Sequence, residues 1–284
     1  MRRKKNGFRH VEHKKRMAVI YVLLRLSVIG VMIAQFFNRN YENVFLCILT
    51  LVLFMLPAMI ERRLHIDLPD TLEIIILLFI YAAEILGEIQ AYYVHLSFWD
   101  TMLHTLNGFL CAAIGFCLVD LLNRDERVSV ELSPFFMAVV AFCFSMTVGV
   151  LWEFFERFMD TALLFDMQKD HVQNTIATVA LDPTRSNRVV VVKDIADVIL
   201  VHSDGSQQAM GLGGYLDLGI YDTMKDLFVN FIGAAAFSVI GFFYVKNRGK
   251  GRFARRFIPR VLKEQEMEQL AEADDAEPAQ DGPG

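Results

Sequence analysis

Eight acidic or histidine side chains lie inside or at the ends of apolar stretches of the sequence, at spacings that place them on single helix faces. They form four pairs: Glu84 and Glu88, Asp100 and His104, Glu153 and Glu156, and Asp222 and Asp226. The members of each pair are three or four residues apart, so in a helix they lie on one face. Ionisable residues are costly within a membrane-spanning helix, and we therefore expect them to line a functional interior.

A divalent cation is the ligand that this set of side chains predicts. Carboxylates packed together cannot all ionise unless protons or a cation neutralise them. Carboxylate oxygens with one imidazole, here His104, suit Mg²⁺, Mn²⁺, Ca²⁺ or Zn²⁺, and the metal identity stays open. The alternative is helix capping, because the helix macrodipole favours acidic residues at an N-terminus. Capping accounts for Asp100 and Asp226 but not for Glu84 and Glu153, which lie towards C-terminal helix ends.

Six apolar stretches must position these residues. A helix needs roughly 20 predominantly apolar residues to cross a bilayer. Ser133 followed by Pro134 is typical of a helix start, with a cap residue before a proline in the first turn. The stretches predict membrane-spanning helices over residues 17–37, 43–60, 71–90, 98–122, 133–160 and 221–245.

The distribution of Lys and Arg predicts the orientation of these helices. Basic residues gather in the segments that six spans place on one side: residues 1–16, the connections holding Arg62, Arg63, Arg124 and Arg127, and the segment after the sixth helix. The short connections of the opposite side hold only Arg39. Basic loops stay in the cytoplasm, so both termini are expected there. All four acidic pairs then lie in the outer half of the bilayer.

The segment between the fifth and sixth helices predicts a small extracytoplasmic β-subdomain. Strands are expected over 175–181, 188–193 and 197–202, with turns at Asp182–Pro183 and Ser203–Gly205. The fold class is an all-α polytopic membrane protein, with a six-helix transmembrane bundle and this subdomain. Its parts are a basic cytoplasmic N-terminus (1–16), five helices (17–160), the β-rich loop (161–219), the sixth helix (220–246) and a tail that is basic and then acidic from Glu264 (247–284).

Several classes of protein are excluded. The four cysteines, none of them in a CxxC pair, do not support a disulfide framework or a zinc knuckle. Phosphate-binding loops and dinucleotide fingerprints are absent, and no nucleic-acid partner is expected. The partners that the sequence predicts are the lipid bilayer and an envelope or lipid substrate. The cysteines all lie in apolar stretches: Cys47, Cys111, Cys117 and Cys143.

The polar positions resemble a bacterial inner-membrane family named for YjdF. The resemblance covers a little over half the chain, and Arg157 departs from the Trp that family members tend to have after the second Glu. It implies a bacterial plasma-membrane location and supports the fold and the polar positions, but the family has no established activity. The matching motifs are Trp99-Asp100-x-x-x-His104 with Gly108, Glu153-x-x-Glu156, and Tyr221-Asp222-x-x-x-Asp226 ending in Gly233-Ala234.

Three functions remain open on the sequence. The first is a cation-binding protein with an outward-facing site, including an enzyme that uses metal-activated water on an envelope or lipid substrate. The second is a cation or proton transporter, and the third is a non-catalytic sensor or scaffold that uses the β-rich loop. The inner halves of the last four helices hold few polar residues, chiefly Glu73 and Asp120, which favours an outer site over a through-path. The sequence has no nucleophile motif that would name a reaction.

Overall fold

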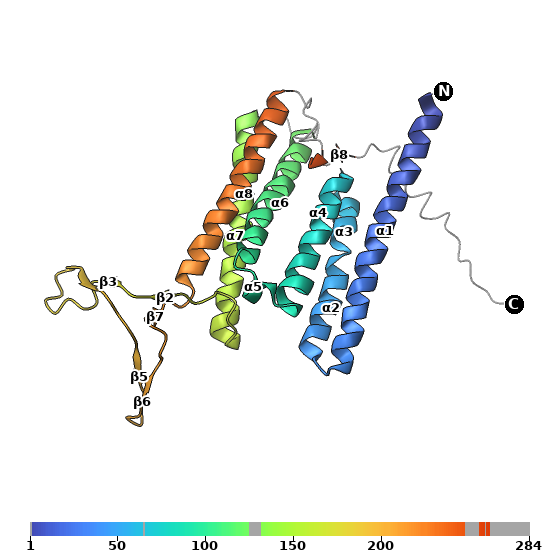
Figure 1. Cartoon of the computed structure of the whole chain (residues 1–284). Coiled ribbons are helices and arrows are strands. Elements are labelled where there is room, and N and C mark those ends of the chain that lie inside the picture. The colour runs from blue at the N-terminus through green and yellow to red at the C-terminus, as the bar shows by residue number, and fades with distance from the viewer. Residues whose placement is uncertain (1, 65, 125–131, 248–255, 259, 262–284) are drawn as a thin grey trace. The chain divides into compact units, whose positions relative to one another are not determined.

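The chain is mostly helical and falls into two compact units, which are described separately (Figure 1). The computed structural model describes all residues except 1, 65, 125–131, 248–255, 259 and 262–284. The larger unit is Met1–Met146 with Asn230–Gly284, and the smaller is Thr147–Val229. Arg127 and the acidic tail from Glu264 lie outside the described residues.

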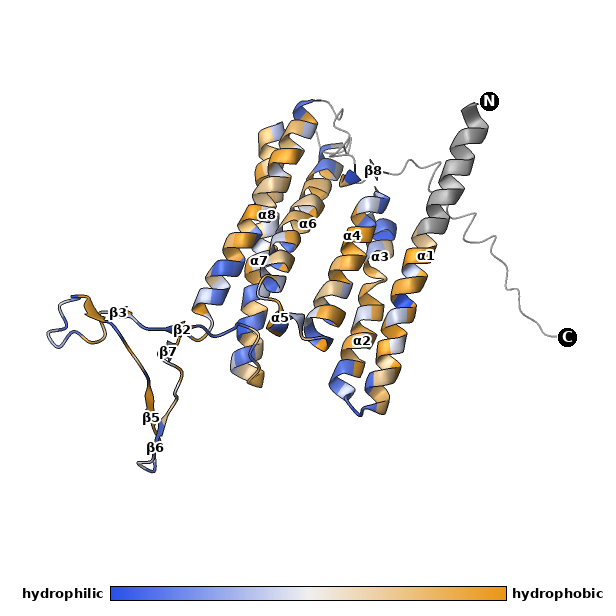
Figure 2. Cartoon of the chain, viewed as in Figure 1, coloured by the Kyte–Doolittle hydropathy of each residue, from blue (hydrophilic) through white to orange (hydrophobic). Residues whose placement is uncertain are grey.

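Five helical stretches of the described chain are long and apolar enough to cross a membrane, where the sequence predicts six (Figure 2). The predicted helix 71–90 is helical, but it is α4 (Asp70–Tyr81) followed by the π-helix η1 (Ala82–Ile89). The change of helix type and the acidic side chains Asp70, Glu73, Glu84 and Glu88 keep it out of the five, so six spans are not confirmed. The five are Met17–Phe37, Tyr41–Arg63, Trp99–Asp120, Pro134–Leu163 and Ile220–Lys246.

The predicted second helix is broken into α2 (Tyr41–Leu53) and α3 (Leu56–Leu64). Pro57 explains the break. Its missing N–H cannot bond to the carbonyl of Leu53, and its ring would clash with that carbonyl. Three other long helices differ from the predicted ranges by a few residues: α6 (Trp99–Arg124), α7 (Pro134–Leu163) and α8 (Ile220–Lys246). The first, α1 (Arg2–Phe37), ends where predicted but begins in the basic N-terminal segment, well before the predicted start at residue 17.

The predicted cap of α7 is confirmed, because the backbone N–H of Phe136 donates to the Ser133 hydroxyl at 3.2 Å. A short helix, α5 (Tyr92–His95), lies in the connection between η1 and α6, where the sequence predicts only a loop. Ala91 before it has a left-handed backbone with φ of 55°, which turns the chain at the end of η1.

A segment after α8 returns to the core of the larger unit. We call residues 256–258 and 260–261 the strap. Phe257 and Ile258 are buried, and the Phe257 ring lies 5.2 Å from that of Phe109 on α6. Strand β8 (Arg260–Val261) pairs antiparallel with β1 (Ile66–Asp67), which precedes α4. The strap therefore joins α6 and the start of α4, a contact that the sequence reading missed.

The smaller unit holds three two-stranded antiparallel ribbons rather than the single small sheet expected. Strands β3 (Ile176–Thr178), β4 (Val190–Val192) and β5 (Ile199–Val201) lie within the three predicted segments. Asp194 has a left-handed backbone just after β4, and the N–H of Ile195 donates to Asn174, so the ladder does not continue. The pairs are β3 with β4, β5 with β6 (Gln207–Ala209), and β2 (Val172–Gln173) with β7 (Tyr215–Leu216).

Aspartate-centred turns hold these ribbons. The predicted turn at Asp182 is confirmed: the carboxylate accepts from the Thr184 hydroxyl at 2.6 Å and from the backbone N–H groups of Thr184, Ser186 and Arg188. These hydrogen bonds, the Thr184 hydroxyl first, hold the pKa of Asp182 well below its usual range. The predicted hairpin turn between β5 and β6 is also confirmed, with Gly205 at φ of 86°.

The strap gives a direct test of the fold. In a chain whose native cysteines are replaced, Ile66→Cys with Val261→Cys should form a disulfide on mild oxidation. The two positions are register partners, and Cα atoms of antiparallel partners lie about 4.5–5.5 Å apart, within the usual range of a disulfide. The measurement is the mobility shift of the oxidised protein on a non-reducing gel after an internal cleavage.

The matched control is Ile66→Cys with Arg260→Cys, which is one residue out of register. Successive residues of a strand face opposite sides of a ribbon, so this pair is not expected to cross-link. Equal cross-linking of both pairs, or none in either, would contradict the docked strap.

Candidate functional site

The first turns of α6 carry a histidine–carboxylate pair. His104 Nε2 lies 3.4 Å from Asp100 Oδ1, one helical turn away, and both side chains are partly buried. The helix is placed against η1 by Trp99, whose Nε1–H donates to the carbonyl of Ala82 at 3.3 Å. Asp100 and His104 each offer one ligand atom suited to a cation, so the predicted pairing of these two residues is seen within the larger unit.

One turn further along α6, a buried amide pair joins two helices. The side-chain N–H of Asn107 donates to Asn230 Oδ1 on α8 at 3.4 Å. Cys111 Sγ lies 3.4 Å from Asn107 Oδ1, and Asn230 Nδ2 lies 3.6 Å from the Met146 sulfur. These contacts give both amides a partner and fix how α6 and α8 face each other.

Two glycines let the backbones of α6 and α8 approach closely. A Cβ built on Gly108 would lie 2.1 Å from the carbonyl oxygen of Asn230. A Cβ on Gly233 would lie 2.0 Å from the carbonyl oxygen of Thr105. The carbonyl of Gly108 also accepts from the Ser145 hydroxyl of α7 at 2.7 Å. Small residues at such crossings are typical of helix packing in membranes.

The two glutamates of α7 are buried on a helix whose neighbouring apolar side chains are exposed. Glu153 is 4% exposed and Glu156 is buried, whereas Phe154 is 66% exposed. Trp152 Nε1–H donates to Glu156 Oε1 at 2.7 Å. A helix in water would expose its glutamates and bury its phenylalanines. The observed distribution is the opposite, and it is the one expected of a helix with lipid on its outside.

The start of α8 shows the same distribution. Asp222, Asp226 and Asn230 are buried along one face, with Asp226 only 1% exposed. Met224 and Phe228 on the other side of the helix are exposed, Phe228 by 62%. The predicted polar face of this helix is therefore also its buried face.

Asp222 has protein donors at both of its oxygens. Oδ2 accepts from the backbone N–H of Lys169 at 2.9 Å, and Oδ1 lies 2.9 Å from Lys225 Nζ. The same ammonium lies 3.6 Å from Asp226 Oδ1. Asp222 thus anchors the β-rich loop to α8, a role that spacing alone does not reveal.

Asp160, near the end of α7, has a similar anchoring role. Its two oxygens accept from the backbone N–H groups of Met167 at 2.6 Å and Gln168 at 2.9 Å. The Gln168 side chain donates to the Thr223 hydroxyl at 2.6 Å. Sequence reasoning did not predict that these loop residues bind Asp160. Every residue except proline has a backbone N–H, so the residue type does not show which one donates.

Glu84 and Glu88 lie on the π-helix η1. Glu84 is partly buried and Glu88 is exposed. Gly87 between them is buried, and a Cβ there would lie 2.4 Å from the Tyr93 ring of α5. Single π-helical turns are frequent at functional sites, because they change the angular spacing of side chains. The sequence pattern gives no signal for this change of helix type.

The structure brings the predicted residues together in separate groups. In the larger unit these are the Asp100–His104 pair and the Asn107–Asn230 pair; in the smaller unit Asp222 and Asp226 share Lys225. Glu84, Glu88, Asp100 and His104 belong to one unit and Glu153, Glu156, Asp222 and Asp226 to the other. A single site with all eight residues therefore stays a prediction.

Comparisons with known proteins give a family and no activity. Residues 20–247 match the family described as "Predicted membrane protein (DUF2238)". An uncharacterised protein of Thermotoga maritima is 24% identical over 107 residues, which are 38% of this chain and 53% of that protein. The chain thus spans about half the length of this relative. No solved structure shows a significant match to the chain.

The crossing of α6 and α8 can be tested by adding one methyl group. Gly108→Ala should lower the free energy of unfolding by roughly 1–3 kcal/mol, because the new Cβ meets a backbone oxygen that can move only with its helix. Thermal unfolding of the purified protein in detergent measures the effect.

Gly30→Ala is the matched control on α1, since a Cβ there meets nothing within 4 Å. This change should be neutral or stabilising, because alanine is a better helix former than glycine. Equal stability of the two variants would contradict the close crossing.

Proposed function

The chain belongs to the DUF2238 family of predicted membrane proteins, and on this premise we propose that it is a bacterial inner-membrane protein that binds a divalent cation. The proposed site lies in the outer half of the bilayer. It takes its ligands, directly or through water, from the carboxylates and the imidazole that the sequence singles out. These are Glu84, Glu88, Asp100, His104, Glu153, Glu156, Asp222 and Asp226.

The observation that carries the proposal is the burial of carboxylates on helices with exposed apolar side chains. Glu153 and Glu156 on α7 and Asp226 on α8 are buried, whereas their neighbours Phe154 and Phe228 are exposed. Taking ionised carboxylates away from water is strongly unfavourable unless a positive charge accompanies them. Lys225 is one such charge beside Asp222 and Asp226, and we propose a bound divalent cation as another.

α6 packs against the part of α8 that belongs to the larger unit. In the larger unit Asn107 meets Asn230, Phe109 meets Phe237, and Phe116 meets Gly241, so the two helices run parallel in one register. His104 lies one turn before Asn107, and Asp226 lies one turn before Asn230. We propose that both His104 and Asp226 contribute ligands to the cation site.

The ligand chemistry suggests what the cation would do. Hard carboxylate oxygens with one imidazole suit Mg²⁺, Mn²⁺, Ca²⁺ or Zn²⁺. A cation held this way would lower the pKa of a bound water and let it attack an ester or phosphoester. We therefore propose an envelope or lipid substrate, which reaches a site in the outer half of the bilayer from the membrane or its surface.

We also propose six spans with both termini in the cytoplasm. α4 and η1 together contain 20 residues, and we count them as the sixth span (12 in α4 and 8 in η1). Reporter fusions after Arg62, Asp125 and Arg252 should report the cytoplasm, and a fusion at Asn187 should report the exterior, because the basic segments stay inside. An exterior signal at Arg252 would contradict an even number of spans.

Metal analysis of the purified protein tests the site itself. Wild-type protein should retain a divalent metal, and His104→Ala should lose most of it, because the only imidazole of the proposed ligand set is removed. His95→Ala is the matched control, since His95 is exposed on α5. Metal content per chain is measured by mass spectrometry. The unfolding temperature of the metal-free protein is then measured with Mg²⁺, Mn²⁺, Ca²⁺ or Zn²⁺ added.

A cation at 100 times its dissociation constant should stabilise the wild-type protein by about 2.7 kcal/mol and His104→Ala by much less. Asp226→Asn, which keeps the shape of the side chain, should behave like His104→Ala. If His104→Ala and His95→Ala retain equal metal, or if none of the cations binds wild-type protein, the proposed site is wrong.

A further inference from the structure

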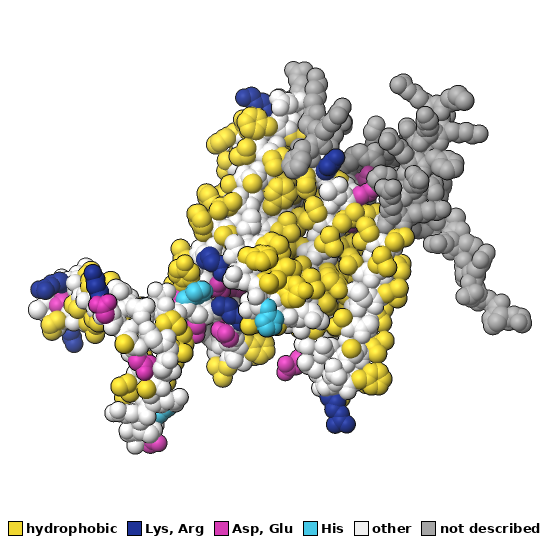
Figure 3. Space-filling view, viewed as in Figure 1, with side chains coloured by type: hydrophobic (Ala, Val, Ile, Leu, Met, Phe, Trp, Pro, Cys, Tyr) yellow, Lys and Arg dark blue, Asp and Glu magenta, His cyan; other side chains and the backbone are white. Residues whose placement is uncertain are grey.

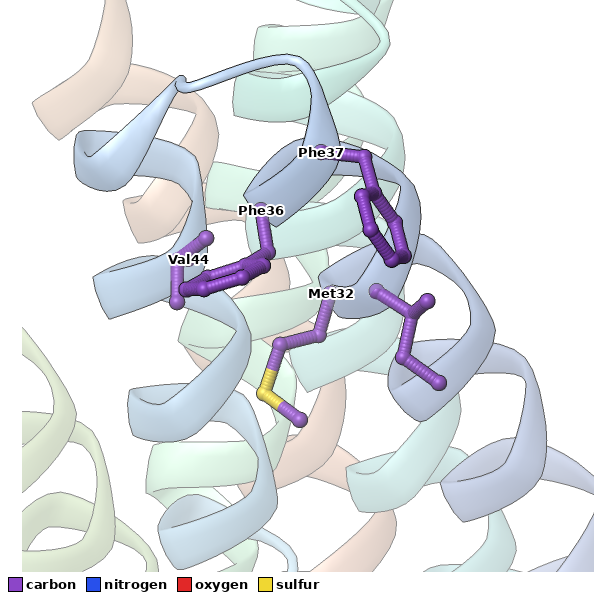
Figure 4. Close-up of a pocket in the computed structure, with 5 residues that line it drawn as sticks. Met32, Phe36, Phe37 and Val44 are labelled. Carbon is purple, nitrogen blue, oxygen red and sulfur yellow. The ribbon is translucent and has the colours of Figure 1, made fainter.

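An apolar groove lies between the end of α1 and the start of α2 (Figure 4). Every side chain that lines it is hydrophobic, and Phe36 and Phe37 are exposed, Phe37 by 79%. Hydrophobic side chains also cover much of the helical surface around it (Figure 3). The groove lies between the stretches Met17–Phe37 and Tyr41–Arg63, each long and apolar enough to cross a membrane, so acyl chains would surround it. Its lining residues are Met32, Ile33, Phe36, Phe37 and Val44.

A basic residue follows the groove-lining residues of α1 in the chain. Arg39 is exposed in the short connection between the helices, two residues after Phe37. It has a left-handed backbone with φ of 59°, an uncommon conformation for a residue other than glycine. Its N–H donates to the carbonyl of Phe36, and Asn40 accepts from the N–H of Asn43, so the connection is held in place.

The position of Arg39 also departs from the charge pattern of the chain. In the proposed topology the other short connection outside the membrane has no Lys or Arg. Basic residues are disfavoured on that side, so one at a membrane surface needs a reason. A guanidinium pairs with phosphate through two parallel hydrogen bonds, and the headgroup phosphates of phospholipids lie at this level.

We propose that the groove and Arg39 form a binding site for one phospholipid of the surrounding membrane. An acyl chain lies along Met32, Phe36 and Val44, and the headgroup phosphate pairs with the guanidinium of Arg39. The groove offers no polar group that could recognise a soluble ligand. Because the guanidinium of Arg39 supplies a positive charge at the level of the headgroup, we expect the site to prefer an anionic phospholipid over a zwitterionic one, although Glu42 is exposed in the first turn of α2.

Native mass spectrometry of the full chain in detergent tests this site. Phosphatidylglycerol and phosphatidylcholine with the same acyl chains are titrated, and the first binding constant is measured for each. Arg39→Gln should weaken the first phosphatidylglycerol about fivefold, which corresponds to roughly 1 kcal/mol for one basic residue at a membrane surface. It should change phosphatidylcholine binding less.

Two further variants separate the headgroup contact from the groove. Arg63→Gln is the charge-matched control, because Arg63 is exposed at the other end of the same span. It should leave both constants unchanged. Val44→Trp fills the groove and keeps Arg39, so it should lower the binding constants of both lipids. If Val44→Trp lowers the unfolding temperature, Ile33→Trp is used as the groove-filling variant instead.

Three results would overturn the proposal. Equal losses in Arg39→Gln and Arg63→Gln would mean that only net charge matters. Unchanged binding in a folded groove-filling variant would mean that the acyl chain lies elsewhere. A wild-type dimer that Val44→Trp converts to a monomer would show that a second copy of the chain covers the groove.

Discussion

The close crossing of α6 and α8 is the contact on which the polar interior depends. Gly108 and Gly233 allow the backbones to meet, and the Asn107–Asn230 amide pair lies at the crossing. Lipid tails are as apolar as leucine, so the hydrophobic effect gives little preference for one helix pairing over another in a bilayer. Backbone shape and polar contacts between the helices then decide the register of α6 and α8.

The acidic residues of α7 and α8 described above fall into two kinds by their roles, and Asp222, which is itself buried, anchors the loop. Asp160 and Asp222 lie near helix ends and accept hydrogen bonds from the backbone of the following or preceding loop. Glu153 and Asp226 are instead buried along helix faces, within helices that expose phenylalanine to their surroundings. The first kind holds the β-rich loop on its helices. The second kind explains why these helices need a polar interior, and the proposed cation follows from that need.

Sequence reasoning recovered what depends on local pattern. The ranges of α6, α7 and α8, the Ser133 cap and the Asp100–His104 spacing all follow from neighbouring residues. The break before Pro57 could have been predicted from the proline itself. The π-helix could not, because the periodicity of apolar residues does not distinguish an α-helix from a π-helix. The sequence predicted the positions of β3, β4 and β5 but not which strands pair. Pairing depends on the direction of the chain after each intervening turn. The anchors of Asp160 and Asp222 use backbone donors, which residue types do not encode.

The strap has a consequence for how the protein is made. Helices enter a membrane in the order of their synthesis, and β1 emerges long before the residues that pair with it. Ile66 therefore has no strand partner, and Phe109 lacks its contact with Phe257, until the segment after α8 has left the ribosome. Insertion of the helices and completion of the core are separate events in this chain. A nascent protein stalled after α8 would be fully inserted yet still expose an unfinished core to the proteases that survey new membrane proteins.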